Sequence, residues 1–260
     1  MKVITVINDV KNFGFNLLRL SCAINNFNLV TLVSYNNFYS RRVKDDLLQI
    51  YLDSIEDDDE IVFFTDGIDA LLLTTEIEIL NKFHRFNAEL IFSAETGCWP
   101  DPAMADLYPY SFKTPYRFLN SGGFIGRVGT IKKLLEKDIA DDQFPQSNQY
   151  VWAKKYLDKD TLIELDTNCE IFCTFSPEAG KEYLPKGGND YFLYYQFMKE
   201  WFSKNFLVEN QRIFNRITNT WPCHIHFNGD SKWLIDNDII NMVYSRFLPS
   251  ENIEFLFEQD

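Results

Sequence analysis

The chain has 260 residues, of which 46% are hydrophobic and 16% aromatic, and these values exclude a disordered protein. Its formal net charge of −13 argues against a nucleic-acid partner, because nucleic-acid binding requires a basic face. No stretch has the apolar length needed to span a membrane, and the five scattered cysteines favour reduced thiols over a zinc site.

The first half of the chain alternates strand patterns with helix patterns. Apolar runs predict buried strands over residues 3–7, 29–34, 61–64 and 88–92. Apolar residues spaced three and four apart predict helices over residues 15–24, 43–55 and 75–86. Strand–helix–strand units with short connections imply an α/β fold, with a mostly parallel sheet flanked by helices.

After residue 96 this regular alternation ends. Prolines make residues 98–102 a loop, and residues 118–126 form a strand pattern that contains Gly122 and Gly123. A glycine pair in a strand indicates either close approach of a ligand or a β-bulge. We expect three further helices, over 131–137, from 141 to 152, and after Trp233. No linker interrupts the chain, so we expect one domain over residues 1–260.

Two carboxylates, Asp66 and Asp69, follow the strand at 61–64. Acids at the carboxyl end of a buried strand occupy the usual place of a ligand crevice in an open α/β sheet. Two hard oxygen ligands there can hold Mg²⁺ or Mn²⁺ against a diphosphate. The alternative for so short a motif is a solvated turn capped by aspartate.

The N-terminal residues 1–9 fit a first buried strand better than a signal peptide. The apolar stretch is five residues long, is broken by Thr5, and leads into Asn8 and Asp9 without a small-residue cleavage site. We therefore expect a cytoplasmic protein; a chain from which a leader had been removed would belong to the secretory compartment.

Several segments together resemble one family, in the family's order. They are Thr65–Asp69, Phe92–Glu95 with Cys98–Pro100, Arg117–Gly126, Asp141–Gln143 and His226–Lys232. The chain is similar to the N-terminal glycosyltransferase domain of multifunctional procollagen lysyl hydroxylases, from Val3 to about Lys232. The resemblance implies a GT-A-type, Rossmann-like fold. Because the chain is too short to include a lysyl hydroxylase domain as well, we expect a free-standing glycosyltransferase, of the kind that suits a virus or microbe.

The resemblance implies a manganese site made by Asp66, Asp69 and His226. A lone histidine is more often a structural core residue, but the adjoining Asn228 and the two upstream acids favour a ligand. A neutral imidazole suits Mn²⁺ better than Mg²⁺. His224 has no counterpart in the family pattern and is interpreted as structural.

The resemblance also implies a binding site for a UDP-sugar donor. Lys232 would supply a positive charge to the diphosphate, and Arg42 falls near another basic contact, with Lys44 as a competing register. The full set of expected donor-binding residues is Val3, Thr5, Arg42, Asp66, Gly122, Asn228, Gly229 and Lys232.

Three residues match catalytic positions of the family. Trp99 matches a loop tryptophan over the donor sugar, where an indole can stack on a hexose. Asp141 and Asp142 match the end of an acidic stretch that contacts sugar hydroxyls and the acceptor, although two aspartates before a helix are also ordinary caps. Glu95 and Asn120 are further candidates.

The function implied is a Mn²⁺-dependent, retaining transfer of glucose from UDP-glucose to galactosyl-hydroxylysine in a collagen-like protein. Two alternatives stay open. The enzyme could use another UDP-sugar or acceptor, or the chain could be a weakly active sugar-nucleotide-binding module.

Overall fold

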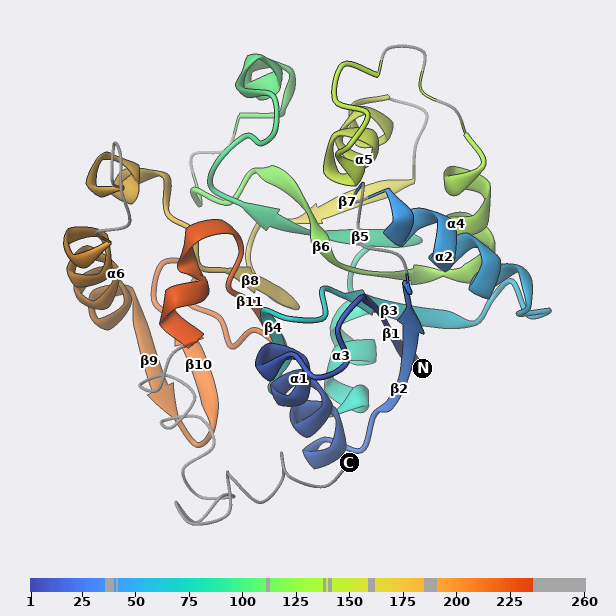
Figure 1. The fold of residues 1–260 in the computed structure, drawn as a ribbon, viewed down its shortest axis with the longest axis horizontal. Helices are drawn as coiled ribbons and strands as arrows, with labels where there is room; N and C mark the ends of the chain where they lie inside the picture. The colour runs from blue at the N-terminus through green and yellow to red at the C-terminus, as the bar shows by residue number, and fades with distance from the viewer. Residues whose placement is uncertain are drawn as a thin grey trace.

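A six-stranded mixed sheet forms the centre of the protein, which we describe from a computed structural model. The structure describes residues 1–35, 40, 42–110, 113–137, 139, 142–158, 162–184 and 191–235. The strands are β1 (Lys2–Ile7), β2 (Asn28–Val33), β3 (Ile61–Thr65), β5 (Leu90–Glu95), β6 (Phe118–Arg127) and β7 (Ile163–Asp166). Their order is β2-β1-β3-β6-β5-β7, and every neighbouring pair is parallel except those made by β6 (Figure 1). The expected α/β class, with a mostly parallel sheet, is confirmed.

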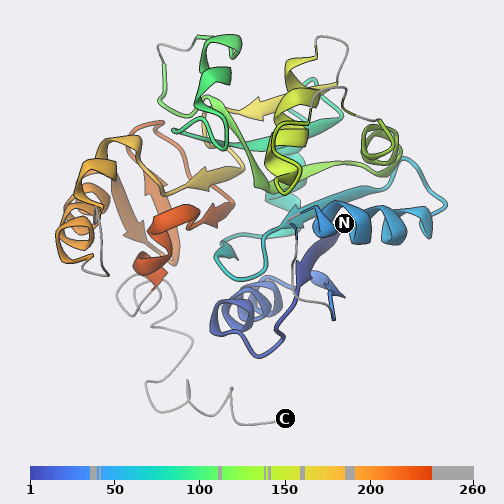
Figure 2. The ribbon, with the colours of Figure 1, turned by 45° about the horizontal axis from the view of Figure 1, so that its top comes forward.

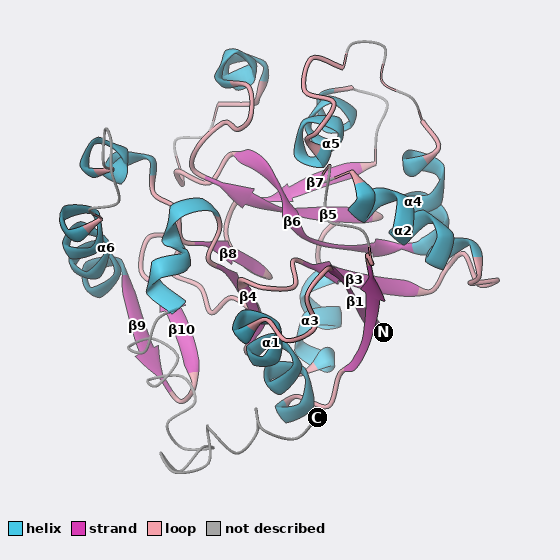
Figure 3. Ribbon diagram, viewed as in Figure 1, coloured by secondary structure: helices cyan, strands magenta, loops and turns pink. Residues whose placement is uncertain are grey.

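Helices cover both faces of this sheet (Figure 3). Side chains alternate between the faces of a strand, so Ile4 and Phe64 pack in one hydrophobic cluster with α2 (Val43–Asp53), α4 (Val128–Leu135) and α5 (Asn148–Leu157). Val3 and Phe63 pack in the other cluster, with α1 (Phe13–Ile24) and α3 (Glu76–Phe83). Burial on both faces explains why these strands are almost wholly apolar.

A second, three-stranded sheet joins the two halves of the chain. It has the order β4-β11-β8 and is made of β4 (Ala70–Leu72), β8 (Phe172–Thr174) and β11 (His224–His226). Beside it lie α6 (Phe192–Asn205) and the hairpin of β9 (Phe206–Glu209) and β10 (Arg212–Asn215), away from α2 and α4 (Figure 2). Three 3₁₀ helices complete the described chain: η1 (Pro102–Leu107), η2 (Glu178–Tyr183) and η3 (Gly229–Ile235).

The structure corrects one helix boundary that matters for the site. The helix expected from residue 141 begins instead at Asn148, where the Ser147 hydroxyl accepts the N–H of Tyr150 at 3.3 Å. Asp142 therefore lies in the preceding loop, and Asp141 is outside the described residues. The helix expected after Trp233 also falls mostly outside them; η3 ends at Ile235. Within the described ranges, no helix combines the length and apolarity needed to cross a membrane.

Candidate active site

The loop between β3 and β4 carries Asp66 and Asp69. It begins at the carboxyl end of β3, where the N–H of Asp66 donates to the carbonyl of Gly122 at 2.8 Å. Helix α1 lies directly against the loop, because a Cβ at Gly14 would stand 1.7 Å from the carbonyl oxygen of Ile68. The glycine therefore permits a backbone contact that holds the acidic loop in place.

His226 reaches the same loop from β11. This strand pairs antiparallel with β4, with His226 opposite Ala70, and the next residue, Phe227, donates its N–H to the Asp69 carbonyl at 2.8 Å. Nε2 of His226 lies 3.4 Å from Oδ1 of Asp69 and 3.7 Å from Oδ2 of Asp66. One potential ligand atom from each of the three residues lies within 4.8 Å of the other two, so the three side chains can share one cation.

Gly122 makes room for the His226 ring. A Cβ at this position would stand 2.2 Å from Cε1 of the imidazole, and one at Gly123 would stand 2.9 Å from the ring of Phe172. The pairing of β5 with β6 also shifts register between Phe92 and Ser93, where the partner changes from Phe124 to Asn120, so the ladder is irregular around the glycine pair. The side of Gly122 on which a Cβ would stand is thus occupied by the histidine ring.

Two lysines neutralise the acidic pair. Nζ of Lys232 lies 2.9 Å from Oδ2 of Asp69, and Nζ of Lys44 contacts Oδ1 of Asp66. Burial opposes ionisation of Asp69, but His226 and Lys232 outweigh it and hold the pKa of this carboxyl below its usual range. Burial also lowers the pKa of His226, and the neighbouring carboxylates outweigh that effect and raise it.

The group made by Asp66, Asp69 and His226 fits a divalent cation. Oδ1 of Asp69 is buried and has no hydrogen-bond partner among the described residues, although a buried oxygen normally has one. Carboxylate oxygens with one imidazole nitrogen form a donor set that suits Mn²⁺. Three protein ligands leave further coordination positions for substrate oxygens.

A family comparison agrees with this geometry. The profile of the PLOD GT domain, the glycosyltransferase domain of that family, matches residues 1–252. The chain belongs to the PLOD GT family. It is accordingly a glycosyltransferase, and the resemblance read from its motifs is confirmed.

Relatives of this PLOD GT domain are longer proteins. The chain is 38% identical over 206 residues to human multifunctional procollagen lysine hydroxylase and glycosyltransferase LH3, covering 76% of the chain but 24% of LH3. It is 29% identical over 192 residues to the uncharacterized protein R699 of Acanthamoeba polyphaga mimivirus, covering 73% of the chain and 36% of that protein. The chain thus spans 24% of the human relative and 36% of the mimivirus protein.

The fold is that of GT-A glycosyltransferases. A solved glycosyltransferase involved in glycosylation of the major capsid of PBCV-1 superposes with a TM-score of 0.51 at 9% identity. The superposition covers 92% of this chain and 97% of the other, so the similarity extends across the whole architecture.

A buried carboxylate adjoins the histidine of this PLOD GT domain. Glu95, at the end of β5, accepts hydrogen bonds from the side-chain amides of Asn120 (3.1 Å), Gln149 (2.6 Å) and Asn228 (2.7 Å). Burial raises the pKa of Glu95 to about 7, and the amide donors only partly offset this. Asn120 in turn contacts His226, so the Asn120 side chain links Glu95 to the group of Asp66, Asp69 and His226.

Two of the expected catalytic residues, Trp99 and Asp142, lie in described loops outside the group of Asp66, Asp69 and His226. The Trp99 side chain is 44% exposed, and its carbonyl accepts the amide of Gln149 at 3.0 Å, which joins the tryptophan loop to Glu95. Asp142 forms an ion pair with Arg42. The lysine two residues later, Lys44, forms an ion pair with Asp66 instead.

The remaining expected donor-binding residues differ in their surroundings. Val3 is fully buried in a hydrophobic cluster, so its side chain lies away from the polar centre. Thr5 lies beside Gly67, at which a Cβ would stand 2.9 Å from the threonine hydroxyl. That hydroxyl and Oδ1 of Asn228 are buried without a partner among the described residues. Gly229 has a left-handed φ of 59°, which glycine adopts readily.

Sequence reasoning missed Gln149 and Gly14 and left Lys44 as an alternative. Gln149 lies on α5 and carries no local signal, so only the packing of that helix against β6 reveals its contact with Glu95. His224 was expected to be structural, and its Nε2 lies 2.8 Å from the hydroxyl of Thr65 in the protein interior.

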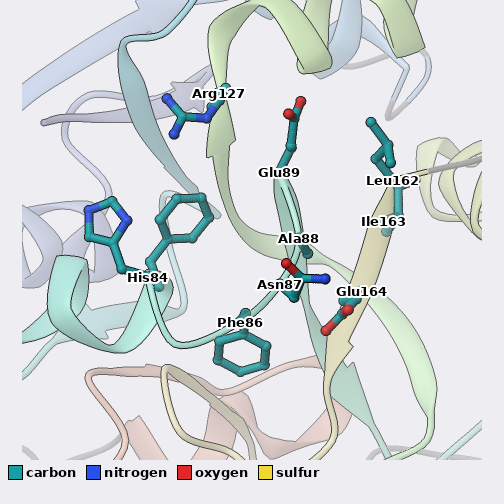
Figure 4. A pocket seen from close by; sticks show the side chains of 10 residues that line it. His84, Phe86, Asn87, Ala88, Glu89, Arg127, Leu162, Ile163 and Glu164 are labelled. Carbon is teal, nitrogen blue, oxygen red and sulfur yellow. The ribbon is translucent and has the colours of Figure 1, made fainter.

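A separate cavity of about 620 Å³ lies where β5 and β7 begin, at the ends of these strands away from the candidate active site (Figure 4). Glu89, Arg127 and Ile163 are among its lining residues; Glu89 precedes β5, Arg127 ends β6 and Ile163 begins β7, all at the side of the sheet away from Asp66. None of the expected site residues lines it, so it has no part in the candidate active site.

Proposed function

We propose that this PLOD GT domain transfers glucose from UDP-glucose to galactosyl-hydroxylysine in a collagen-like protein, with Mn²⁺ and with retention of anomeric configuration. The observation that carries the proposal is the convergence of Asp66, Asp69 and His226 between two lysines. The human relative is named as a procollagen lysine hydroxylase and glycosyltransferase, which supports a collagen-like acceptor.

Asp66, Asp69 and His226 would hold the cation, which would act as a Lewis acid toward the diphosphate of the donor. The imidazole in this set favours Mn²⁺ over Mg²⁺, because Mg²⁺ prefers oxygen ligands. Oδ1 of Asp69, which is buried without a hydrogen-bond partner in the described part of the chain, would gain one in the cation.

Lys44 and Lys232 would then serve the leaving group. Each contacts a carboxylate of the site, and a bound cation would compete with the lysines for those oxygens. Their ammonium groups could turn to the diphosphate, where negative charge grows as UDP departs. Placing charge where it develops in the transition state accelerates the chemical step itself.

The transfer breaks the bond between the sugar C1 and the β-phosphate oxygen, and UDP keeps the electron pair. The acceptor hydroxyl oxygen forms the new bond to C1 on the face that UDP leaves, and its proton passes to the departing β-phosphate oxygen. Trp99 would cover the sugar and limit access of water. Asp142, with Asp141 beside it in sequence, would orient hydroxyl groups. Thr5 and Asn228 offer buried oxygens to the donor.

The test is UDP release from a panel of UDP-sugars with Mn²⁺, with and without a galactosyl-hydroxylysine peptide. Acceptor-stimulated release from UDP-glucose alone would support donor and acceptor together. Release from a different sugar would overturn the glucose assignment and keep the metal site. Absence of release from every donor would favour a sugar-nucleotide-binding module and overturn the proposed transfer.

A further inference from the structure

The imidazole of His226 has different neighbours at its two nitrogens. Nδ1 lies 3.0 Å from Oδ1 of Asn120, whereas Nε2 faces the carboxylates of Asp66 and Asp69. A metal ion needs an unprotonated nitrogen, so the atom opposite Nδ1 decides whether Nε2 is available. If that atom accepts a hydrogen bond, Nδ1 carries the proton and Nε2 keeps its lone pair for the cation.

The orientation of the Asn120 amide follows from its other contacts. Its Oδ1 also accepts the backbone N–H of Gly122 at 3.0 Å, and its Nδ2 donates to Oε1 of Glu95 at 3.1 Å. A rotated amide would place its NH₂ group against the Gly122 N–H and its oxygen against the Glu95 carboxylate. Both contacts would be repulsive, so Oδ1 is the atom that faces His226.

Glu95 is itself fixed from two further directions. Gln149 donates to Oε1 at 2.6 Å and Asn228 donates to Oε2 at 2.7 Å, and the glutamate is only 7% exposed. Every described hydrogen-bond neighbour of this carboxylate is therefore a donor. A rigid acceptor in this position keeps the NH₂ end of Asn120 turned away from the histidine.

We infer that Asn120, held by Glu95, is a positioning residue that fixes the His226 ring with its proton on Nδ1 and its Nε2 directed at the metal site. The inference rests on the proposed function, because it assumes that His226 is a metal ligand. Outer groups that orient a ligating histidine fix its tautomer, and their loss commonly lowers metal affinity about 10- to 100-fold. Gly122 contributes twice, by donating to Asn120 and by leaving room for the ring.

The first variant is Asn120→Leu, which keeps the side-chain size and removes the acceptor. We expect Mn²⁺ affinity, measured by electron paramagnetic resonance without any donor sugar, to fall about 10- to 100-fold. Pulsed electron paramagnetic resonance on the Mn²⁺ that still binds should show loss of the ¹⁴N coupling from His226, because the carboxylates would then hold the ion without the imidazole. Thr114→Val is the matched control, since it removes a hydroxyl that donates to the Thr167 carbonyl at 2.6 Å and leaves Asn120 and the acidic loop intact.

A pair of Glu95 variants tests the inference without changing Asn120. Glu95→Gln keeps an acceptor for Asn120, and its NH₂ can meet Oδ1 of Asn228, which has no partner among the described residues. We expect this variant to retain the ¹⁴N coupling. Glu95→Leu frees the Asn120 amide to rotate, so we expect this variant to lose the ¹⁴N coupling. Its net charge is the same as that of Glu95→Gln, so a difference between the two variants cannot come from charge.

The outcomes separate the inference from the proposed function. Wild-type protein that binds Mn²⁺ without a ¹⁴N coupling would overturn the assignment of His226 as a ligand, and with it the proposed metal site. A wild-type coupling that survives unchanged in folded Asn120→Leu and Glu95→Leu variants would overturn the positioning role alone. Equal losses in Glu95→Gln and Glu95→Leu would also overturn it, because they would trace the effect to charge.

Discussion

Gly122 lies so close to His226 that an added Cβ would stand 2.2 Å from the imidazole Cε1. The strand β6 and the strand β11 can therefore approach only because residue 122 has no side chain. We predict that Gly122→Ala displaces the ring and lowers Mn²⁺ affinity about tenfold or more. Isothermal titration with Mn²⁺ measures this effect. Gly97→Ala is the control, because its Cβ would meet the movable end of Glu178; equal affinity in both variants would contradict the prediction.

The ion pair of Lys44 with Asp66 leads to a prediction with two opposite signs. In Lys44→Met the competing ammonium is gone, so Mn²⁺ alone should bind about fivefold more tightly. UDP affinity in the presence of Mn²⁺ should fall, because the lysine would no longer meet the diphosphate. Lys2→Met, which removes a lysine 2.9 Å from Glu60 at the sheet edge, serves as the matched control. A parallel change in both affinities would contradict the competition.

Removal of Asp69 should abolish catalysis while the protein remains folded. Asp69→Asn keeps the side-chain shape and loses the charge that faces His226 and Lys232. We expect Mn²⁺-dependent UDP release to drop about 100-fold or more. Asp59→Asn, at an exposed carboxylate that pairs with Arg127, should retain full release. Full activity of the Asp69 variant would show that the metal site lies elsewhere.

Trp99 should affect turnover more than nucleotide binding. The residue is 44% exposed and its backbone carbonyl accepts the amide of Gln149, which joins the tryptophan loop to the Glu95 network, so we expect the indole to cover the sugar and leave UDP binding intact. Trp99→Ala should lower kcat about tenfold, and Trp99→Phe should retain more activity because a ring face remains. Kinetics together with UDP titration separate the two effects. A loss confined to UDP affinity would place the tryptophan at the nucleotide instead.

The acid stability of the fold should depend on Glu78. Burial opposes its ionisation, but hydrogen bonds from Arg212, Thr74 and Lys82 outweigh that effect and lower the pKa from 4.5 to about 2. A depressed pKa contributes stability above the unfolded value, and that contribution is lost as the pH falls from about 4.5 toward 2. Denaturant unfolding at pH 7 and pH 3 should therefore show a smaller acid loss in Glu78→Gln than in wild type. Identical losses would exclude this carboxylate as a source of acid sensitivity.

Local patterns predicted the long elements of the fold and could not predict the short ones. Residues 3–7 and 61–64 read as strands because both faces are buried, and they match β1 and β3 closely. The strands β4, β8 and β11 have three residues each, which is too short for alternation to show. They form only through pairing with one another, so the sheet that positions His226 was not predicted.

The same division applies to the site. Asp66 and Asp69 were predicted from their place after a strand, and the chain's resemblance to a family supplied His226 and Lys232. The choice between Arg42 and Lys44 depends on the turn of α2, where Lys44 precedes the buried Leu48 by four residues and so lies on the inward side. The spacing is visible in the sequence, but only the packed structure shows that this side of α2 meets the loop that carries Asp66.

The pairing of β4 with β11 has a consequence for the stability of the fold against heat and proteases. Asp69 leads into one of these strands and His226 ends the other, so a shared ion would tie the two ends of a loop that contains more than half of the protein. Cross-links that close long loops restrict the unfolded chain most. A ligand that binds only the folded state also stabilises it by mass action. Resistance to heat and to proteases should therefore rise with Mn²⁺ concentration, and the C-terminal strands should gain as much protection as the loop itself.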